Sequence, residues 1–443
     1  MIARWPSGEP SGRWGLNILI ASPTYVPFIG GTRTFLQKMA RRLVADGHRV
    51  TVLTTNAQQA SDFWQPPPST RHVLSAREVL DGVVVERLAL RYPWPAPYRF
   101  GLFRRVGLGL QLSGLPAAAT RPIQRHLSRW MPPLEGLSQT LQRLVPEADV
   151  VHADDSSWDG LFAAAAFAAG RHSKLLVVRP LMHLGSRWVQ AHYQMAHQVE
   201  AYRAAAAVLA LSQVEAAAYS SCGVAASRLS VLPMGVELGA ALSAEGVDIE
   251  GLERDPAVQR PIVAFVGANT YDKGAFTLAE AVIHLAVQGV PLTLICVGPQ
   301  EQALFAFLRR QPATLQDTVR QHVRVLGVVT EVAKHRLLAA CDLLALPSQV
   351  DAFGIVLLEA WLHRKPVIGA WAGGIPEVVK HEENGLLVPF GDVEALAAAI
   401  RRLLENPDWA AQLGESGYQG LGHYTWDRTY ETLLQAYDLA RGS

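Results

Sequence analysis

The sequence predicts an α/β protein built from two doubly wound parallel sheets, and three observations lead to this expectation. Short β-branched runs alternate with longer helical stretches along most of the chain, as in parallel sheets covered by crossover helices. The length of 443 residues exceeds what one hydrophobic core usually serves. A polar stretch at 237–259 separates two such alternating series, so two domains are expected.

The first series begins with the strand LNILIAS at 16–22 and the helix GTRTFLQKMARRLVADG at 31–47. One face of that helix carries Leu36, Met39, Ala40 and Leu43. The strands HRVTVLTT, GVVVERLAL, ADVVHAD, KLLVVRP and AVLALS follow, with an alanine-rich helix at 161–169. We place this N-terminal domain at 16–236 and a linker at 237–260.

The second series runs from RPIVAFVGA at 260–268 through LTLICVG, VRVLGVV, DLLALPS, KPVIGAW and NGLLVPF. Helices are expected at 276–288 and 393–404, the latter with Asp392 as its N-cap and Pro407 beyond its end. We place this C-terminal domain at 261–422. The remaining segment, 423–443, is expected to be an amphipathic helix that packs back on the N-terminal domain.

Composition argues against several classes of protein. Lysine and arginine number 40 and aspartate and glutamate 39, so no net charge directs the whole molecule to nucleic acid, and no groove-reading motif is present. The cysteines form no CxxC and resemble the reduced thiols of cytosolic proteins. No apolar run reaches the roughly 20 residues of a membrane span, and the N-terminus lacks a signal-peptide core. We therefore expect a cytoplasmic protein, and one without a cofactor or metal, since no ligand spacing suits zinc.

The strongest functional signal is DAFGIVLLEAWLHRKPVIGAWAGGIPEVV at 351–379. A helix starting near Phe353 would direct four amides at an anion, those of Phe353, Gly354, Ile355 and Val356. Asp351 would flank that helix start within reach of sugar hydroxyls, and Glu359 would accept both hydroxyls of a ribose. Taken singly, Asp351 could be a simple N-cap. Glu359 could be a half-buried acid paired with a base such as Arg364 or Lys365.

Other candidates follow strand ends, where open α/β sheets bind ligands. Gly30 and Gly31 precede the first long helix, where glycine allows close approach to an anion, or the loop simply needs positive φ. Lys273 occupies a strand-to-helix turn from which its ammonium could reach a diphosphate, unless it is an ordinary surface lysine. The strand-end position of His183 favours a catalytic role over a structural one, whereas His152 is interpreted as structural.

In this order the motifs resemble those of a retaining glycosyltransferase of the GT-B fold, family 4. The resemblance covers nearly the whole chain, through IGGTRTFLQKMARRLVADGHRVTVLTT, DVVHAD, ALSQVEAAAYSSCGV, VLPMGV, FVGANTYDKG, DLLALPS, DAFGIVLLEAWLHRKPVIG and GGIPEVVKHEENGLLV. It implies two Rossmann-like domains facing across a cleft, with the acceptor on the N-terminal one. It also implies metal-independent transfer of a hexose-type sugar, UDP- or GDP-linked, with the anomeric configuration retained.

The resemblance implies a role for each candidate residue in holding the donor. Lys273 would neutralise the diphosphate together with the amides of 353–356, and Asn269 lies close by in the sequence. Glu359 would hold the ribose, and the backbone near Val328 would hold the base.

The same resemblance implies how the sugar reacts. Asp351 would hold the donor sugar, His183 would touch it near the reacting carbon, and Gly30 and Gly31 would approach the phosphate from across the cleft. No protein nucleophile is evident. Front-face attack is therefore favoured, with a donor phosphate oxygen taking the acceptor's proton.

Two departures from the family pattern keep other functions open. Asp351 stands where the family usually has glutamate, which is longer by one C–C bond of about 1.5 Å. Ala268 and Asn269 stand where many members carry arginine, so one phosphate-neutralising charge is missing unless another base, such as Arg179, supplies it. A catalytically inactive GT-B protein that binds a nucleotide or a partner is the first alternative. A nucleotide-sugar epimerase or phosphorylase of the same fold is the second.

A basic segment distinguishes the first domain. From 87 to 134 the chain carries eight arginines and no acid, with aromatic residues interleaved. We single out Arg99, Arg104 and Arg105 as an acceptor or membrane patch. Such a segment is typical of contact with an anionic lipid surface or a lipid-phosphate acceptor, which would place the protein at the inner face of the cell membrane. The alternative is a packed arginine-rich insertion, in which glycines weaken any amphipathic helix.

Overall fold

The computed structural model describes residues 15–28, 31–93, 96–185, 187–237 and 258–442. The chain divides into two compact units. The first comprises residues up to 180 with 195–208 and those from 437 onward, and the second comprises 181–194 with 209–436. The domain boundaries expected at 236 and 261 stay predictions. The linker expected at 237–260 falls mostly on 238–257, outside the described residues.

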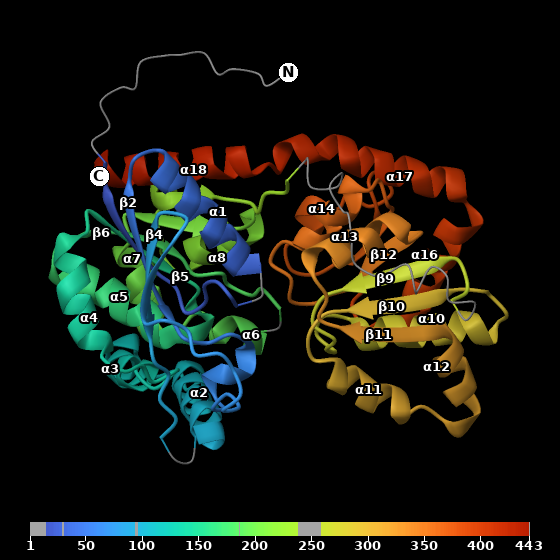
Figure 1. The fold of residues 1–443 in the computed structure, drawn as a ribbon, viewed down its shortest axis with the longest axis horizontal. Helices are drawn as coiled ribbons and strands as arrows, with labels where there is room; N and C mark the ends of the chain where they lie inside the picture. The colour runs from blue at the N-terminus through green and yellow to red at the C-terminus, as the bar shows by residue number, and fades with distance from the viewer. Residues whose placement is uncertain (1–14, 29–30, 94–95, 186, 238–257, 443) are drawn as a thin grey trace, which may run out of the picture. The chain divides into compact units, whose positions relative to one another are not determined.

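The first sheet, drawn in blue to green in Figure 1, has eight strands in the order β3-β4-β2-β1-β5-β6-β7-β8. In chain order they are β1 Asn17–Ala21, β2 Arg49–Thr55, β3 Arg77–Leu80, β4 Val83–Leu88, β5 Val150–Asp154, β6 Leu175–Arg179, β7 Ala207–Ala210 and β8 Leu229–Val231. The central strand β1 pairs in parallel with β2 and β5, whereas β3 adds to β4 as an antiparallel edge. The strand order reverses at β1, which is where such sheets bind ligands beyond the carboxyl ends of the strands.

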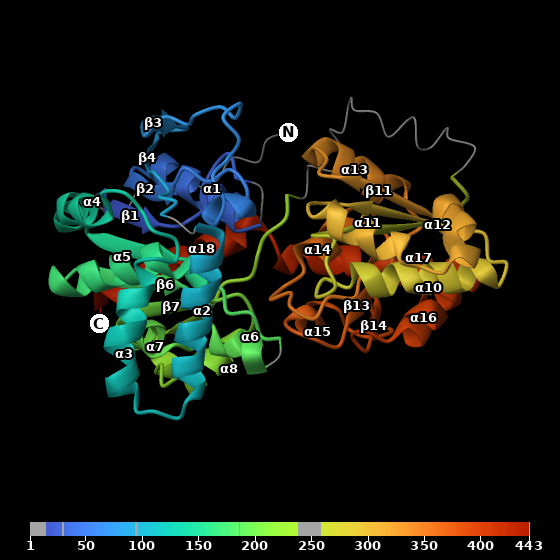
Figure 2. The same cartoon turned by 90° about the horizontal axis from the view of Figure 1, so that it is seen from below.

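Helices form successive layers over this sheet. α1 (Gly31–Ala45) packs on β2 and β4, and α5 (Asp159–Arg171) packs on β5 and β6. α7 (Ala196–Ala204) and α3 (Ala117–Ser128) pack on α5 and on each other. α4 (Leu137–Leu144) also packs on α5. α2 (Ala96–Leu112) packs in turn on α3, and the two lie side by side in Figure 2. One face of α2 therefore points away from the sheet.

The glycines of α2 do not prevent the helix from forming. Gly107 allows α2 to approach its neighbours closely, because its carbonyl accepts a hydrogen bond from Gln124 Nε2 of α3 at 3.1 Å. A Cβ at this position would lie 3.3 Å from the sulfur of Met195. The segment is therefore a continuous helix over 96–112, despite the sequence argument against one.

The second sheet has six strands in the order β11-β10-β9-β12-β13-β14, and its strand pairs are parallel. Its strands are β9 Ile262–Val266, β10 Thr293–Val297, β11 Val323–Gly327, β12 Leu343–Leu346, β13 Val367–Ala370 and β14 Leu386–Val388. The order reverses at β9. With helices alternating along both sheets, the doubly wound α/β class is confirmed.

Two groups of helices cover the second sheet, on opposite sides because right-handed crossovers run outward in both directions from β9. α10 (Ala275–Val287) packs with α12 (Gln316–His322) and α16 (Val393–Glu405). α14 (Ile355–Leu362) packs with α13 (Glu331–Ala340) and α17 (Pro407–Gly420). Asp392 caps α16 as expected, since its Oδ1 accepts from the amide of Ala395 at 2.9 Å. The short α6 (Arg187–Ala191), α8 (Gln213–Ser221), α11 (Glu301–Arg309), α15 (Ile375–Val378) and the final α18 (Trp426–Gly442) complete the α-helices of the described residues.

Candidate functional site

The motif at 351–379 folds as a loop, helix α14 and strand β13, with a shift at the helix start. α14 begins at Ile355 rather than near Phe353, because Gly354 adopts a left-handed conformation (φ 75°) as the helix N-cap. Asp351 is therefore not the N-cap of this helix, and the alternative interpretation of Asp351 as a simple N-cap is wrong. The first amides of a helix have no partner within it, so those of Ile355 and Val356 face outward at the positive end of the helix dipole.

Lys273 and Asp351 form an ion pair at the carboxyl edge of the second sheet. Lys273 Nζ lies 3.0 Å from Asp351 Oδ1, and about a fifth of each side chain is exposed (23% and 20%). The loops that carry them are joined, because the amide of Gln349 donates to the carbonyl of Asp272 at 2.9 Å. Burial alone raises the pKa of Asp351, but Lys273 and a hydrogen bond from Ser348 outweigh it and leave the pKa below its ordinary value. The carboxylate therefore stays ionised.

His183 completes a cluster with this pair. Its Nδ1 lies 2.9 Å from the carbonyl oxygen of Val350. A carbonyl only accepts, so Nδ1 carries the proton and Nε2 presents a lone pair. Burial lowers the pKa of His183, and the nearby Lys273 lowers it further against the opposing effects of the Val350 carbonyl and Asp351. A neutral imidazole, an ammonium and a carboxylate thus meet in one place.

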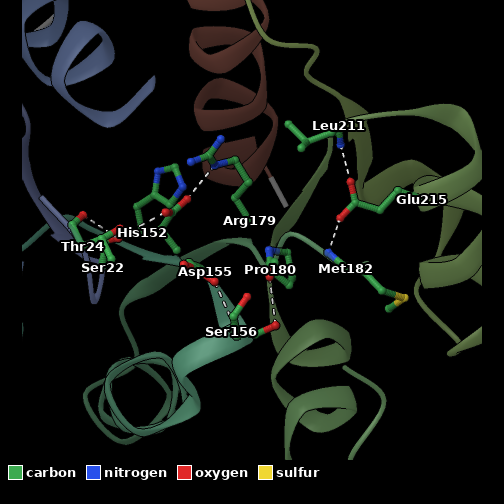
Figure 3. Close-up of polar contacts among 12 residues, drawn as sticks. Ser22, Thr24, His152, Asp155, Ser156, Arg179, Pro180, Met182, Leu211 and Glu215 are labelled. Atoms are coloured by element: carbon green, nitrogen blue, oxygen red, sulfur yellow. Dashed lines mark hydrogen bonds and ion pairs between the residues drawn. The ribbon is translucent and has the colours of Figure 1, made fainter. Parts of the chain in front are cut away.

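Glu215 holds the loop that carries His183, and Figure 3 shows its carboxylate between two backbone amides. It accepts from the amides of Met182 and Leu211 at 2.6 Å each, and from the hydroxyl of Tyr219 at 2.6 Å. Leu181 has φ 61°, a conformation that costs about 1–3 kcal/mol in a bulky residue. Glu215 stabilises this strained turn. Sequence reasoning missed it, although an acid two residues into a helix after a strand was a visible signal.

The paired glycines after β13 serve the backbone of the Asp351 loop. The amide of Gly374 donates to the carbonyl of Asp351 at 2.9 Å. A Cβ on Gly373 would lie 2.2 Å from that same oxygen, and one on Gly374 would lie 1.9 Å from the carbonyl oxygen of Ala352. No side chain fits in either place. The spacing of the motif therefore reflects close packing of this loop on the segment that carries Asp351.

Glu359 is paired with a base that sequence reasoning did not identify. Its Oε1 lies 2.8 Å from Lys334 Nζ, and the same ammonium lies 2.7 Å from Glu331 on α13. Burial alone lowers the pKa of Lys334, but the two carboxylates outweigh it and the pKa is raised. The predicted partners were wrong, since Arg364 pairs with Glu415 at 2.7 Å. Only 14% of the Glu359 side chain is exposed, which is consistent with an acceptor fixed in direction by Lys334.

The same corner contains a group of possible metal ligands. Ligand atoms of Glu331, His335 and Glu359 lie within 4.8 Å of one another. Lys334 bridges the two carboxylates, and His335 Nδ1 lies 3.1 Å from His363 Nε2. Burial lowers the pKa of His335, and burial with the charge of His335 lowers that of His363 to about 4. Metal-independent chemistry stays a prediction.

Asn269 and Val328 lie at neighbouring strand ends. The side chain of Asn269 is fully buried, and its Nδ2 donates to the carbonyls of Gly298 at 2.9 Å and Pro299 at 3.2 Å. It thereby ties the end of β9 to that of β10. Val328 follows β11 and is 51% exposed. These positions lie near β9, where the strand order of the sheet reverses. Ala268, in the same region, has no charged side chain.

In the first unit, the glycine loop is only partly visible. Gly30 lies outside the described residues, and Gly31 is the exposed first residue of α1. Arg33, in the first turn, directs its Nε to the carbonyl of Phe28 at 2.9 Å. The expected approach of Gly30 and Gly31 to a phosphate stays a prediction.

Arg179 does not supply the missing phosphate-neutralising charge. It is fully buried, its Nε lies 2.6 Å from Asp154 Oδ1, and its guanidinium lies 3.5 Å from the centroid of the Phe35 ring. Figure 3 shows its side chain beside that of His152. His152 is itself buried, with Nδ1 2.8 Å from the hydroxyl of Tyr437, in agreement with a structural role. Burial, aided by Arg179, lowers the pKa of His152 to about 3.

The basic segment is partly neutralised by acids from outside it. Ion pairs join Arg87 to Glu78, Arg91 to Glu135, and both Arg121 and Arg125 to Glu200. The patch of Arg99, Arg104 and Arg105 on α2 makes no ion pair with any carboxylate of the described residues. Among the helices that the structure describes, none is both long enough and apolar enough to cross a bilayer. The excess charge of the segment is therefore concentrated on α2.

Comparisons with known proteins agree with the resemblance. The family model for Glycosyltransferase Family 4 matches residues 29–240, and that for Glycosyl transferases group 1 matches residues 253–420. A D-inositol 3-phosphate glycosyltransferase of Segniliparus rotundus is 29% identical over 48% of this chain and 47% of its own. An alpha-maltose-1-phosphate synthase of Mycolicibacterium smegmatis is 33% identical over 41% and 48%. The chain thus spans about half the length of these relatives.

Other similar proteins match over more of their length. A GDP-mannose-dependent alpha-(1-6)-phosphatidylinositol monomannoside mannosyltransferase of Mycobacterium tuberculosis is 27% identical over 73% of this chain and 84% of its own. HepE of Anabaena, solved with UDP, has a TM-score of 0.67 at 20% identity, over 96% of this chain and all (100%) of that one. Sucrose-phosphate synthase from Thermosynechococcus elongatus has a TM-score of 0.69 at 22% identity, over 97% and 100%. The chain therefore belongs to glycosyltransferase family 4 and has the GT-B fold.

Proposed function

We propose that this protein transfers a sugar from a nucleotide diphosphate sugar to an acceptor with retention of the anomeric configuration. The observation that carries this proposal is the cluster of Lys273, Asp351 and His183 beside the start of α14. It combines a cation and outward-facing amides for a diphosphate with a carboxylate and a neutral imidazole for sugar hydroxyls. The charges suit a reaction whose leaving group is an anion.

The diphosphate binds over the amides of Ile355 and Val356 and draws the Lys273 ammonium toward it. Asp351 is then able to accept hydrogen bonds from the donor sugar. As the glycosidic bond breaks, the fixed dipoles and the ammonium stabilise the charge that develops on the leaving phosphate. Glu359, oriented by Lys334, accepts the ribose hydroxyls.

The acceptor attacks the same face of the sugar from which the diphosphate leaves. A phosphate oxygen of the donor takes the proton of the acceptor hydroxyl, so no protein nucleophile is needed. His183 offers its Nε2 lone pair to a hydroxyl of the donor sugar and holds the reacting carbon in position. This sequence of contacts retains the anomeric configuration.

The relatives favour GDP-mannose as the donor and an inositol-containing lipid as the acceptor. The relative that shares the larger part of its length is described as a GDP-mannose-dependent phosphatidylinositol monomannoside mannosyltransferase. Another is described as an inositol 3-phosphate glycosyltransferase. Acceptors of this kind carry a phosphate, which the basic segment of the first unit suits.

We further propose that α2 rests on an anionic membrane surface at the cytoplasmic face. Tyr98, Leu102 and Val106 are 79%, 56% and 41% exposed. Spaced four residues apart, they lie along one side of the helix. Arg105, also exposed, belongs to the same side. Apolar side chains next to arginine are the composition of an interfacial helix.

The test is transfer itself. The purified chain is incubated with radiolabelled GDP-mannose or UDP-glucose and vesicles that contain phosphatidylinositol, beside Asp351→Asn. The proposal expects labelled lipid from the wild type only. Donor consumed without any acceptor would favour an epimerase or phosphorylase, and donor bound without turnover would favour an inactive GT-B protein. Either result would overturn the proposal.

A further inference from the structure

An aromatic pocket lies in the first unit, among residues that follow β2 and β4 and residues of α2. About 260 Å³ of space, including its opening to solvent, is enclosed by side chains that include Phe63, Trp64, Tyr92, Phe100, Trp130 and Arg99. None of these residues belongs to the proposed donor site. The space is a shallow hollow that opens to solvent, so it suits one part of a larger ligand and does not enclose a whole one.

The rings around the pocket stack on one another and stay partly open to solvent. Trp158 lies at the centre, with ring centroids 4.0 Å from Phe63, 5.9 Å from Trp64 and 5.4 Å from Phe100. Phe63 is 2% exposed, whereas Trp64, Phe100 and Trp158 are only half-buried. Half-buried aromatic clusters in a hollow commonly mark a binding surface.

The polar groups of the pocket suit an anion and do not suit a polyol. The Arg99 guanidinium lies 4.3 Å from the centroid of the Trp130 ring, so stacking orients it while its N–H groups stay able to donate. The Tyr92 hydroxyl already donates to the carbonyl of Asp62 at 2.6 Å. No lining side chain is Asp, Glu, Asn or Gln. Sugar hydroxyls would therefore find few acceptors.

α2 connects this pocket to the exposed apolar face described above. Arg99 and Phe100 line the pocket, while Tyr98 and Leu102, on either side of them in the sequence, are exposed on the outer face. A hydrocarbon chain that leaves a lipid surface in contact with α2 would pass only the width of that helix before it reaches the aromatic rings of the pocket.

We propose that the pocket binds the apolar chain of an anionic amphiphile, with Arg99 on a phosphate joined to that chain. The inference rests on the proposed function, because it names the chemical class of the acceptor. Acyl and isoprenoid chains share this chemistry. Aromatic rings bury the chain segment next to the phosphate, and the Arg99 guanidinium, which forms no ion pair with a described carboxylate, balances the negative charge.

Intrinsic fluorescence tests the proposal, since Trp64, Trp130 and Trp158 all lie in or against the pocket. The full chain is titrated with dodecyl phosphate and with farnesyl phosphate, each below the concentration at which it forms micelles. Farnesol, which lacks the phosphate, and inositol 1-phosphate, which lacks the chain, are the comparison ligands. We expect saturable changes with either phosphate amphiphile, binding about tenfold weaker for farnesol, and no response to inositol 1-phosphate. Silence with both phosphate amphiphiles, or equal binding of inositol 1-phosphate, would overturn the proposal.

Two variants on α2 separate the pocket from the outer face of the helix. Arg99→Gln should weaken the binding of the phosphate amphiphiles about tenfold and leave the binding of farnesol unchanged. Tyr98→Ser, one residue away on the outer face, should change neither. An equal loss of amphiphile binding in both variants would assign that binding to the outer surface of α2 and overturn the pocket proposal.

Thermal shifts with GDP and UDP on the same samples report folding and the donor site independently. If the protein binds the amphiphile but no nucleotide, the pocket proposal stands and the proposed function fails. If the protein binds nucleotide but no amphiphile, the proposed function stands and the pocket proposal fails.

Discussion

Lys273 and Asp351 lie 3.0 Å apart, Nζ to Oδ1, across two loops that follow neighbouring strands of the second sheet. This contact gives a physical account of the aspartate at a position where the family usually has glutamate. The shorter carboxylate is held against the lysine, and its pKa is kept low there despite burial. The two residues that we propose hold the diphosphate and the donor sugar are therefore paired with each other in this structure.

Replacing Lys273 with methionine should strongly weaken the binding of nucleotide diphosphates. The ammonium is the charged partner of the diphosphate in the account given above, and a hydrogen bond to a charged group contributes about 1.5–3 kcal/mol. We expect the Kd of GDP or UDP, measured by calorimetry, to rise between about tenfold and a hundredfold. Lys380→Met, an exposed lysine of the same unit, is the control. Equal affinity in wild type and Lys273→Met would remove Lys273 from the donor site.

Lys334→Met should destabilise the fold and disturb the ribose site together. It leaves the mostly buried carboxylate of Glu359 without its cation, which costs about 1–3 kcal/mol. The double variant Lys334→Met/Glu359→Gln should recover part of that loss, because no buried charge remains. Urea unfolding of the two single variants and the double variant measures the coupling. Additive losses would show that the 2.8 Å contact contributes little.

Glu215→Gln should lower kcat while the affinity for GDP stays the same. An amide side chain cannot accept from Met182, Leu211 and Tyr219 as the carboxylate does, so the strained turn before His183 relaxes and the imidazole moves. Glu405→Gln, an exposed acid on α16, controls for the loss of charge. A general loss of folding would lower nucleotide affinity as well. That parallel loss would contradict a positioning role for Glu215.

His152 should make the first unit sensitive to acid. The pKa of the folded residue is about 3 and that of the unfolded residue about 6.5, so between these values only the unfolded state binds the proton. Stability is then complete above pH 6.5 and falls as the pH falls toward 3. In His152→Gln the slope of unfolding free energy against pH between 4 and 6 should decrease by about 1 kcal/mol per pH unit. His172→Gln, an exposed histidine, should leave the slope unchanged, and an unchanged slope in His152→Gln would refute the assignment.

The arginines of α2 should control binding to anionic vesicles. Each basic residue near such a surface contributes about 1 kcal/mol, so Arg104→Gln/Arg105→Gln should reduce partitioning into phosphatidylglycerol vesicles about thirtyfold. Sedimentation with vesicles, repeated at high salt and with phosphatidylcholine alone, measures it. The matched control is Arg309→Gln/Arg310→Gln, two adjacent exposed arginines of the other unit. Equal partitioning of the two double variants would contradict a membrane role for α2.

The sequence predicted both sheets because buried parallel strands read as short apolar runs between helices. β5 and β10, for example, are buried along their whole length. The strand-end rule also singled out Lys273 and Asp351, which follow β9 and β12 of the second sheet, and His183, which follows β6 of the first, and their roles stay predictions. His183, Lys273 and Asp351 lie far apart in the sequence, and each follows a strand.

The parts that could not be predicted depend on side-chain contacts between distant segments. Lys334 and Glu359 belong to different helices, so no local pattern paired them. The start of α14 depended on the left-handed conformation of Gly354. In the basic segment, a local count of charge was misleading because three acids outside it, Glu78, Glu135 and Glu200, pair with four of its eight arginines.

A thermal-shift panel of UDP, GDP, ADP and their common sugars, on wild type beside Glu359→Ala, tests the central claim most directly. A ligand that binds only the folded state raises its stability. The account predicts that one nucleotide class raises the melting temperature of the wild type and that the rise is lost in Glu359→Ala, with the variant still folded. Silence across the panel in a well-folded sample, or an equal rise in both proteins, would contradict a nucleotide sugar held between Asp351 and Glu359.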